Sequence, residues 1–364
     1  MLNTNEILSM NQLHLDIIAN QRLGPMVTSR NLAIMHEAMD HAYDEARKAG
    51  CQDSERGVAV NASAYYMLKA AYPEELPRLD RYFDTQDFDA FDQCVFPGIR
   101  SGLVTYYVRT VDGSALNVTY TPKKTRGHWQ ETGTGPAQRP GWGRVRPFAF
   151  KEPKSYVLKA PPTLNSTDYL SDFNETMSLG AKNSTTRTAD QTASALFWES
   201  GPGTYTPPGQ WSFILQALCR KTNFDYQKTL MVFRQFTSAL GDAGIAAWMN
   251  KYKYETWRPV TAIRENPAYA SWEPLIRTPA FPEYPSGHST FSGAAGEILK
   301  KYFDDGIDFT ITYFGMKRTF KSIPEACKDA GRSRIYGGIH FDFSNEIALN
   351  LGARIAQETM RRID

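Results

Sequence analysis

Apolar residues recur at helical spacing in two long parts of the chain, and this period constrains the fold more than any other feature. Side chains three and four positions apart share one face of an α-helix, and an apolar face must be buried against another element. Segments with clear strand alternation are scarce. We therefore expect a mostly α protein built on a helical bundle. The segments with this period are 26–50, 55–72, 213–221, 225–248, 286–303 and 341–361.

Residues 111–190 interrupt this pattern with a stretch rich in Gly, Pro, Ser, Thr and Asn. A segment this long without periodicity is typical of an ordered surface wrap or a functional loop. We expect short helices inside it, near 168–179 and 184–199. Just before it, residues 94–110 fit both a helix and a strand, and we favour the helix.

We expect one helical domain over residues 1–364. Its parts would be N-terminal helices in 1–110, an irregular wrapping segment in 111–195, and a helical bundle in 196–364. The 364 residues are 41% hydrophobic, which is enough to build a large core. No stretch approaches 18 consecutive apolar residues, so no membrane span is expected.

Charge excludes one class of partner. The 41 Lys and Arg nearly balance 39 Asp and Glu, whereas nucleic-acid binding needs a clustered basic excess. We therefore expect no nucleic-acid partner. The N-terminal residues lack the apolar core of a signal peptide. The compartment stays open between the cytoplasm and export with loss of a leader.

The four cysteines, Cys51, Cys94, Cys219 and Cys327, are far apart in the sequence, so motifs of the CxxC type are excluded. Three pairings are open, and we favour four buried free thiols.

A first candidate segment ends the long helix expected at 225–248. Lys251 and Arg258 lie seven residues apart, close to two helical turns, so on one helix both cations would point the same way. Such a pair repels unless an anion or water lies between the charges. An anion site and a solvated basic face both fit.

A second segment, Pro285-Ser286-Gly287-His288, opens the helix expected at 286–303. Free N–H groups and the positive end of the helix dipole favour an anion beside Ser286 and Gly287. Gly287 allows close approach of a ligand, and His288 would stand in the first turn. The alternative is an ordinary capped helix with a partly buried histidine.

A third segment carries Arg334 and His340, separated by Gly337 and Gly338. The planar guanidinium of Arg334 suits two hydrogen bonds to an oxyanion. His340 would be presented from a tight loop. A helix-entry loop with a buried, hydrogen-bonded histidine is the other interpretation.

Taken together and in this order, the three segments resemble a superfamily signature. It is shared by type 2 phosphatidic acid phosphatases, soluble bacterial acid phosphatases and vanadium-dependent haloperoxidases. Further similarity at residues 29–39, 140–148, 197–198 and 257–264 favours the haloperoxidases, in their bacterial chloroperoxidase-like branch. Soluble acid phosphatases of this superfamily are shorter, and the lipid phosphatases are embedded in membranes.

The resemblance implies a bound vanadate, with His340 as the single protein ligand of the vanadium. Hydrogen peroxide would oxidise bromide or iodide, with chloride as a further candidate, and a small organic acceptor would take up the halogen. His288 would act as acid and base, and a homodimer is expected. Catalytic roles would fall to His288, His340 and Lys251. The residues expected to hold the oxyanion are Lys251, Arg258, Ser286, Gly287, Arg334 and His340.

Two aromatic residues bear on the halide. Trp248 and Phe281 occupy positions that resemble those of the apolar halide pocket in fungal-type chloroperoxidases. Trp248 is equally consistent with a core position on an apolar helix. The same cradle also suits phosphoryl transfer, with His340 as nucleophile and His288 protonating the leaving group. An inactive homologue that only binds an oxyanion is the third hypothesis.

One departure from the superfamily pattern concerns His340. The pattern usually has Asp four residues after the last histidine, and this chain has Ser344. On a helix Ser344 shares the face of His340, whereas Asp342 points away. A carboxylate would orient the imidazole and increase its basicity, but a hydroxyl supplies no charge. Weaker vanadate binding or a weaker nucleophile is therefore implied.

Overall fold

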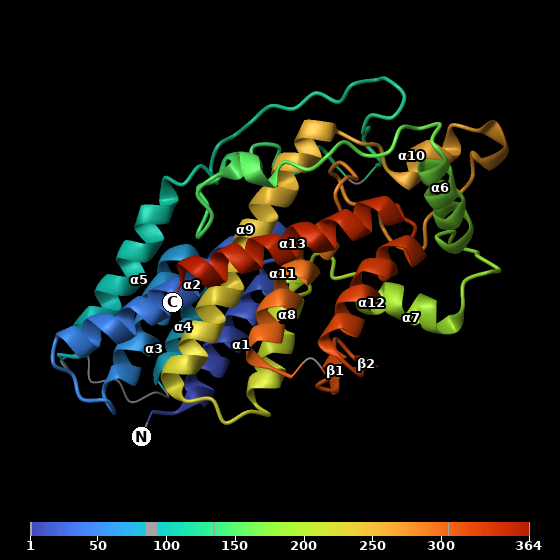
Figure 1. The fold of residues 1–364 in the computed structure, drawn as a ribbon. Helices are drawn as coiled ribbons and strands as arrows, with labels where there is room; N and C mark the ends of the chain where they lie inside the picture. Colours follow the sequence, from blue (N-terminus) through green and yellow to red (C-terminus); the bar gives the residue numbers. More distant parts are fainter. Residues whose placement is uncertain (1, 85–92, 134, 305, 364) are drawn as a thin grey trace. The chain divides into compact units, whose positions relative to one another are not determined.

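The computed structural model describes the whole chain except residues 1, 85–92, 134, 305 and 364. The described residues form thirteen α-helices and one two-stranded sheet (Figure 1), so the predicted mostly α fold is confirmed. They group into two compact units. Unit 1 takes the described residues of 1–115, 201–241 and 359–364, and unit 2 takes those of 116–200 and 242–358. The expected single domain with divisions at 110 and 195 stays a prediction.

Unit 1 is built from helices that pack through small residues. Helix α3 and helix α5 pack on α2 and on each other (Figure 1). Gly98 and Gly102 lie one turn apart on α5, where a Cβ would come within 2.1 Å of the Ala59 carbonyl oxygen and 2.4 Å of the Ser63 carbonyl oxygen. Only glycine permits this approach of two backbones. The helices of unit 1 are α1 (Thr4–Asn20), α2 (Pro25–Lys48), α3 (Arg56–Ala71), α4 (Leu76–Asp84), α5 (Val95–Thr110), α8 (Thr206–Cys219) and the first part of α9 (Tyr226–Tyr254).

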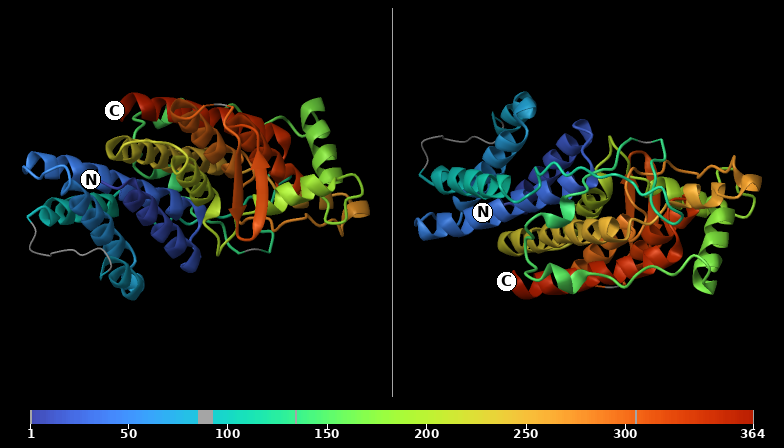
Figure 2. Two further views of the ribbon diagram at one scale, coloured as in Figure 1. Left: turned by 90° about the horizontal axis from the view of Figure 1, so that it is seen from below. Right: turned by 90° about the horizontal axis from the view of Figure 1, so that it is seen from above.

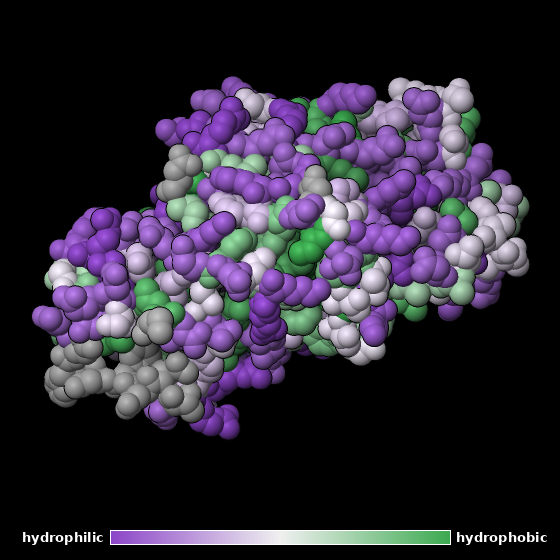
Figure 3. Space-filling view, turned by 60° about the horizontal axis from the view of Figure 1, so that its bottom comes forward, coloured by the Kyte–Doolittle hydropathy of each residue, from purple (hydrophilic) through white to green (hydrophobic). Residues whose placement is uncertain are grey.

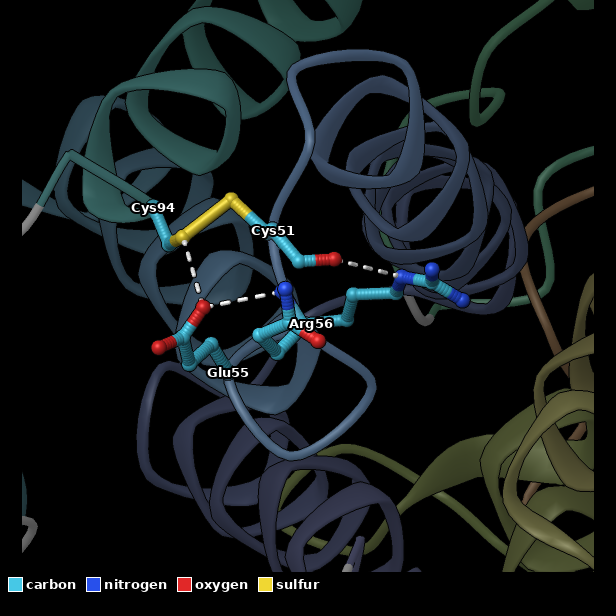
Figure 4. Close-up of a disulfide and its surroundings, with 5 residues drawn as sticks. Cys51, Glu55, Arg56 and Cys94 are labelled. Carbon is cyan, nitrogen blue, oxygen red and sulfur yellow. Dashed lines mark hydrogen bonds between the residues drawn. A yellow bond between two sulfur atoms is a disulfide. The ribbon is translucent and has the colours of Figure 1, made fainter.

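A disulfide joins Cys51 to Cys94 in unit 1, so the expectation of four free thiols is wrong (Figure 4). Cys51 follows α2 and Cys94 precedes α5, and helix packing brings their Cα atoms to 6.0 Å. Glu55 and Arg56 flank the bridge, and Arg56 donates to the Cys51 carbonyl. A separation of 43 residues gives no local signal for this pairing. Cys219 is buried and Cys327 is partly buried, and neither forms a disulfide.

Two histidines are buried inside unit 1. The Nε2 atom of His14 lies 3.0 Å from the Tyr72 hydroxyl, and that of His36 lies 3.2 Å from Asn11 Oδ1. Burial lowers the pKa of both imidazoles to about 3. Both are therefore neutral hydrogen-bonding groups of the core near neutral pH.

Unit 2 packs α11 against α12, and α12 against α7 and α6. An antiparallel hairpin precedes α12, with Phe309 opposite Phe320, and Figure 2 shows it as two paired arrows. Its two turn residues, Phe314 and Gly315, both have positive φ, as a tight two-residue turn requires. The elements of unit 2 are α6 (Thr167–Leu179), α7 (Ala189–Phe197), the second part of α9, α10 (Pro259–Arg264), α11 (Gly287–Tyr302), β1 (Phe309–Tyr313), β2 (Met316–Phe320), α12 (Ile323–Tyr336) and α13 (Asp342–Arg362).

The irregular segment of unit 2 is held by side chains of α9. The buried Asp242 carboxylate accepts hydrogen bonds from the N–H groups of Phe148, Ala149 and Phe150. Asn250, two turns further along, accepts from Leu158 N–H. These N–H groups lie outside regular secondary structure, and side-chain oxygens of α9 accept their hydrogen bonds in place of backbone carbonyls.

Helix positions agree with the apolar period, including the helix favoured at 94–110. The elements that were not predicted from the sequence include α1, α4, the β1–β2 hairpin and α12. In the third candidate segment a tight loop was expected only before His340, and the residues up to Tyr336 belong to α12. Helix α12 contains few apolar residues, and its buried side includes the polar residues Ser333 and Arg334. Its sequence therefore lacks a clear apolar period.

In the part of the chain that the structure describes, no helix is both long enough and apolar enough to span a membrane. The face seen in Figure 3 mixes hydrophilic residues with smaller hydrophobic areas.

Replacing Gly98 with Ala should lower the free energy of unfolding by about 1–3 kcal/mol, because the new methyl group overlaps the Ala59 carbonyl oxygen. Chemical denaturation measures the change. Gly201→Ala is the matched control, since a Cβ there meets nothing within 4 Å. Equal stability of the two variants would contradict the close packing of α3 and α5.

Acid should destabilise unit 1 through His14 and His36. Their folded pKa of about 3 lies below the unfolded value, so between about pH 6.5 and pH 3 the unfolded chain binds more protons. Stability falls as pH decreases through this window, by roughly 1.4 kcal/mol per pH unit for each histidine. The variant His36→Gln should show a shallower dependence in denaturation measured from pH 4 to pH 7. An unchanged slope would argue against a neutral His36.

Candidate active site

The three candidate segments converge inside unit 2. Lys251, Arg258, Ser286 and His340 are fully or almost fully buried, and so is Arg334. The guanidinium of Arg258 lies 3.1 Å from His340 Nε2, and that of Arg334 lies 3.2 Å from His288 Nε2. Each arginine therefore meets one of the two histidines of the signature.

Lys251 and Arg258 do not share a helix, so the expected alignment on one helical face is wrong. Helix α9 ends at Tyr254, and Glu255 adopts a positive φ that turns the chain. Arg258 is the residue before Pro259, which begins α10. Both cations still reach the same place, since Lys251 Nζ and the Arg258 guanidinium lie 5.1 and 4.9 Å from the centre of the Phe281 ring.

The ammonium group of Lys251 is directed at backbone. It donates to the carbonyls of Pro282, Glu283 and Pro285 at 2.9, 2.9 and 2.5 Å. An ammonium has three protons to donate, and three carbonyls receive them. Lys251 thus fixes the loop before α11, and toward a nearby anion it contributes its charge.

Ser286 caps α11 as the sequence predicted. Its hydroxyl accepts the Ser289 N–H, and Gly287 and His288 form the first turn of the helix. A Cβ on Gly287 would lie 3.4 Å from the Trp248 ring and 3.9 Å from Lys251 Cε. Both distances are ordinary contacts, so the protein itself does not require glycine here. His288 is more exposed than its neighbours, which gives the site a side that solvent reaches.

Arg334 lies in the last turn of α12, and a tight turn after the helix then positions His340. Gly337 caps the helix and Gly338 has a φ of 76°, which favours glycine. A Cβ on Gly338 would come within 2.4 Å of the Gly180 carbonyl oxygen. The predicted presentation of His340 after two glycines is what the structure has.

A residue that the sequence reading missed contacts His340. Glu283 Oε1 lies 2.7 Å from His340 Nδ1 and accepts the Phe341 N–H at 3.1 Å. The Glu283 side chain is fully buried. Its signal in the sequence is one acidic residue within an apolar, proline-rich run next to Ser286. Asp342 is instead paired with Arg332 at 3.0 Å, and Ser344 is buried.

Burial and mutual repulsion shift the pKa values of these groups. Burial, together with the Arg258 charge, lowers the pKa of Lys251 well below its usual range. Burial lowers the pKa of Arg258 to about 10 and that of Arg334 to about 9. Burial also holds the pKa of both His288 and His340 well below the usual value, and the neighbouring cations add to the effect. The histidines are therefore neutral, whereas Glu283 acts as a nearby negative charge on Lys251 and Arg258, and Glu199 and Asp329 do so on Arg334.

Glu283 is the fully buried carboxyl group that acts on Lys251 and Arg258. Burial raises its pKa to about 7, whereas Arg258 and Lys251 oppose that shift and favour the ionised form. The Nη2 group of Arg258 is buried and has no hydrogen-bond partner among the described residues. A positive pocket with an unused donor is suited to a small oxyanion.

Trp248 and Phe281 form an apolar wall beside the cations. Their ring centres lie 4.7 Å apart, both side chains are buried, and Lys251 Nζ lies 5.6 Å from the Trp248 ring centre. Every residue predicted from the three segments and from this pair therefore lies in one region of unit 2. Their roles stay predictions. Among the described residues no three His, Cys, Asp or Glu side chains gather to hold a metal ion.

Known proteins are similar to this chain in the sequence of its C-terminal part and in its fold. Residues 231–364 match the family model of the VCPO second helical-bundle domain. Over 191 residues, 43% of the chain, the sequence is 27% identical to vanadium chloroperoxidase of Curvularia inaequalis. That match spans 31% of the length of this curated relative.

Two solved structures share the architecture. A bacterial vanadium-dependent iodoperoxidase superposes with a TM-score of 0.84 at 24% identity, over 100% of this chain and 98% of the other. A holo-type bacterial vanadium-dependent chloroperoxidase superposes with a TM-score of 0.77 at 16% identity, over 95% of this chain and 93% of the other. At these identities the likeness shows the fold.

Replacing Gly287 with Ala separates stability from ligand binding. The Cβ makes ordinary contacts with the protein, and alanine favours a helix, so the free energy of unfolding should stay equal or increase by up to about 1 kcal/mol. The affinity for orthovanadate should fall roughly tenfold, an effect of about 1.4 kcal/mol, because the methyl group occupies the ligand side. Isothermal titration and denaturation test both. Unchanged affinity would remove Gly287 from the site.

Proposed function

We propose that this chain, which is a member of the vanadium haloperoxidase family by its residues 231–364, is a vanadate-dependent haloperoxidase. It would use hydrogen peroxide to oxidise bromide or iodide, with chloride as a further candidate. The observation that carries the proposal is the buried cluster of Lys251, Arg258 and Arg334, in which the two guanidinium groups lie beside His340 and beside His288 in the first turn of α11.

The residues present fit vanadate. Arg258 Nη2 is a buried donor with no partner among the described atoms, and the N-terminus of α11 offers backbone N–H groups. The Ser286 hydroxyl accepts hydrogen bonds from the N–H and the hydroxyl of Ser289 and keeps its own proton to donate. Arg334 would bind from the side of His288. When bound, vanadate supplies a Lewis-acid centre that activates peroxide without a change of oxidation state.

The two histidines take different roles. His340 would be the vanadium ligand through Nε2, because its Nδ1 faces the Glu283 carboxylate. His288 is half-buried, next to Arg334 and at the more exposed side of the site. A neutral imidazole at that position accepts a proton from an incoming peroxide and returns it to a leaving oxygen.

Lys251, expected to be catalytic, would act through its charge. Its protons are directed at three carbonyls, so its positive field lowers the energy of negative charge in the pocket without a direct hydrogen bond. Trp248 and Phe281 would line the halide side and exclude water there, which strengthens the electrostatic interactions of the site.

Phosphoryl transfer is the alternative on the same residues. Phosphate and vanadate place four oxygens in nearly the same positions, and a neutral His340 oriented by Glu283 is also a suitable nucleophile. His288 would then protonate the leaving group. An inactive homologue that holds an oxyanion without turnover is the third outcome. The homodimer and the compartment stay predictions.

The assay uses protein freed of oxyanions, with orthovanadate, hydrogen peroxide, bromide or iodide, and a dimedone-type acceptor. We expect halogenation that requires vanadate and that is abolished in His340→Ala, because the single protein ligand is lost. His41→Ala is the control, since this histidine belongs to α2 in unit 1, where its Nε2 atom lies 3.3 Å from Arg234 Nη2.

The outcomes separate the three hypotheses. Steady hydrolysis of a phosphate ester, without any vanadate-dependent halogenation, would replace the proposal by the phosphatase. Failure of both reactions, with orthovanadate still bound, would leave an oxyanion-binding homologue.

A further inference from the structure

His340 has a carboxylate partner, although the superfamily pattern would take that partner from the position of Ser344. We propose that Glu283 is the positioning residue of His340, and that it supplies from the loop before α11 the charge that is missing at 344. The inference rests on the proposed function, because it assigns His340 as the vanadium ligand.

The contact is short and shielded from water. Glu283 Oε1 and His340 Nδ1 are 2.7 Å apart, and both side chains are buried to 98% or more. The Phe341 N–H donates to the same oxygen at 3.1 Å, which fixes the carboxylate from the far side. A hydrogen bond to an ionised acceptor is stronger than a neutral one, and its strength increases where water is excluded.

The loop that carries Glu283 is held on three sides. Its N–H donates to the Thr256 carbonyl at 2.9 Å, and its own carbonyl accepts from Lys251 Nζ at 2.9 Å. On the other side, Ser286 N–H donates to the Ser344 carbonyl at 3.1 Å, which joins this loop to α13. Glu283 therefore cannot leave His340 without moving the start of α11 and the first turn of α13.

This geometry selects one tautomer of His340. The ionised form of Glu283, which Arg258 and Lys251 favour, only accepts hydrogen bonds, so beside it Nδ1 carries the proton and Nε2 carries the lone pair. Nε2 in turn faces a donor, Arg258 Nη1, at 3.1 Å. The ligand atom is thus unprotonated before any vanadate arrives. A neutral imidazole without Glu283 would divide its population between two tautomers, one of which cannot bind through Nε2.

Ser344 and Glu283 form a matched pair. Glu283 Oε2 and the Ser344 hydroxyl are buried, and neither has a hydrogen-bond partner among the described residues. The Ser344 hydroxyl nevertheless acts to lower the pKa of the Glu283 carboxyl. An Asp at 344 would set two carboxylates side by side in a buried place, where like charges repel. Because Glu283 already supplies the one carboxylate, a serine at position 344 avoids this repulsion.

The test compares Glu283→Gln with Glu75→Gln. Both changes replace a buried carboxylate by an amide of nearly the same shape, and Glu75 lies in unit 1, where it accepts from Asn20 and Gln21. Orthovanadate affinity of the oxyanion-free proteins is measured by isothermal titration. Loss of a carboxylate that supports a metal-bound histidine usually lowers affinity about 10- to 100-fold. We expect this loss in Glu283→Gln and an unchanged affinity in Glu75→Gln.

Two further measurements distinguish positioning from general damage. Nitrogen chemical shifts of His340, from ¹⁵N-labelled protein without vanadate, should show a protonated Nδ1 and a bare Nε2 in the wild type and a mixture in Glu283→Gln. The double variant Glu283→Gln/Ser344→Asp should regain most of the lost affinity, because it returns one carboxylate to the position of the superfamily pattern.

The outcomes are separable from those of the proposed function. Affinity of Glu283→Gln within twofold of the wild type, or a His340 tautomer that does not depend on residue 283, overturns the inference. If the wild type bound no orthovanadate, the proposed function would fail, and the nitrogen shifts alone would still decide whether Glu283 sets the tautomer.

Discussion

The buried ammonium of Lys251 and the three carbonyls that surround it hold the site of unit 2 together. A charge removed from water is costly unless dipoles or counter-charges replace the lost hydration. Here the replacement is the backbone of residues 282–285, so the charge and the loop stabilise each other. Arg258 does the same for the Phe281 and Ile339 carbonyls. Through these hydrogen bonds the two cations connect the chain segment that carries Glu283 to the segment that carries His340.

Helices could be predicted from the sequence where an apolar face decides them. Met26, Ile34 and Met39 in α2 show the period, and their burial confirms it. α12 could not be predicted in this way, because its buried side includes Ser333 and Arg334. The Cys51–Cys94 disulfide was equally hidden, since its two ends are brought together only by the packing of α2, α3 and α5.

The sequence predicted which residues form the site better than it predicted how they contact one another. Spacing identified His288 and His340, but the helical geometry assumed between Lys251 and Arg258 failed at Glu255. Glu283 could not be found in this way, because local helical spacing points from His340 to Ser344, four residues later. The actual partner comes from a segment 57 positions earlier, and only tertiary structure brings the two together.

The buried cations of the site have a consequence for how the protein will behave in buffers. Any small oxyanion that binds the folded chain and not the unfolded one stabilises it by mass action, by about 2.7 kcal/mol when present at 100 times its Kd. Binding of phosphate or sulfate, which are small oxyanions, would raise the melting temperature and compete with vanadate. The shift in melting temperature across a series of oxyanions would therefore rank their affinities without any turnover.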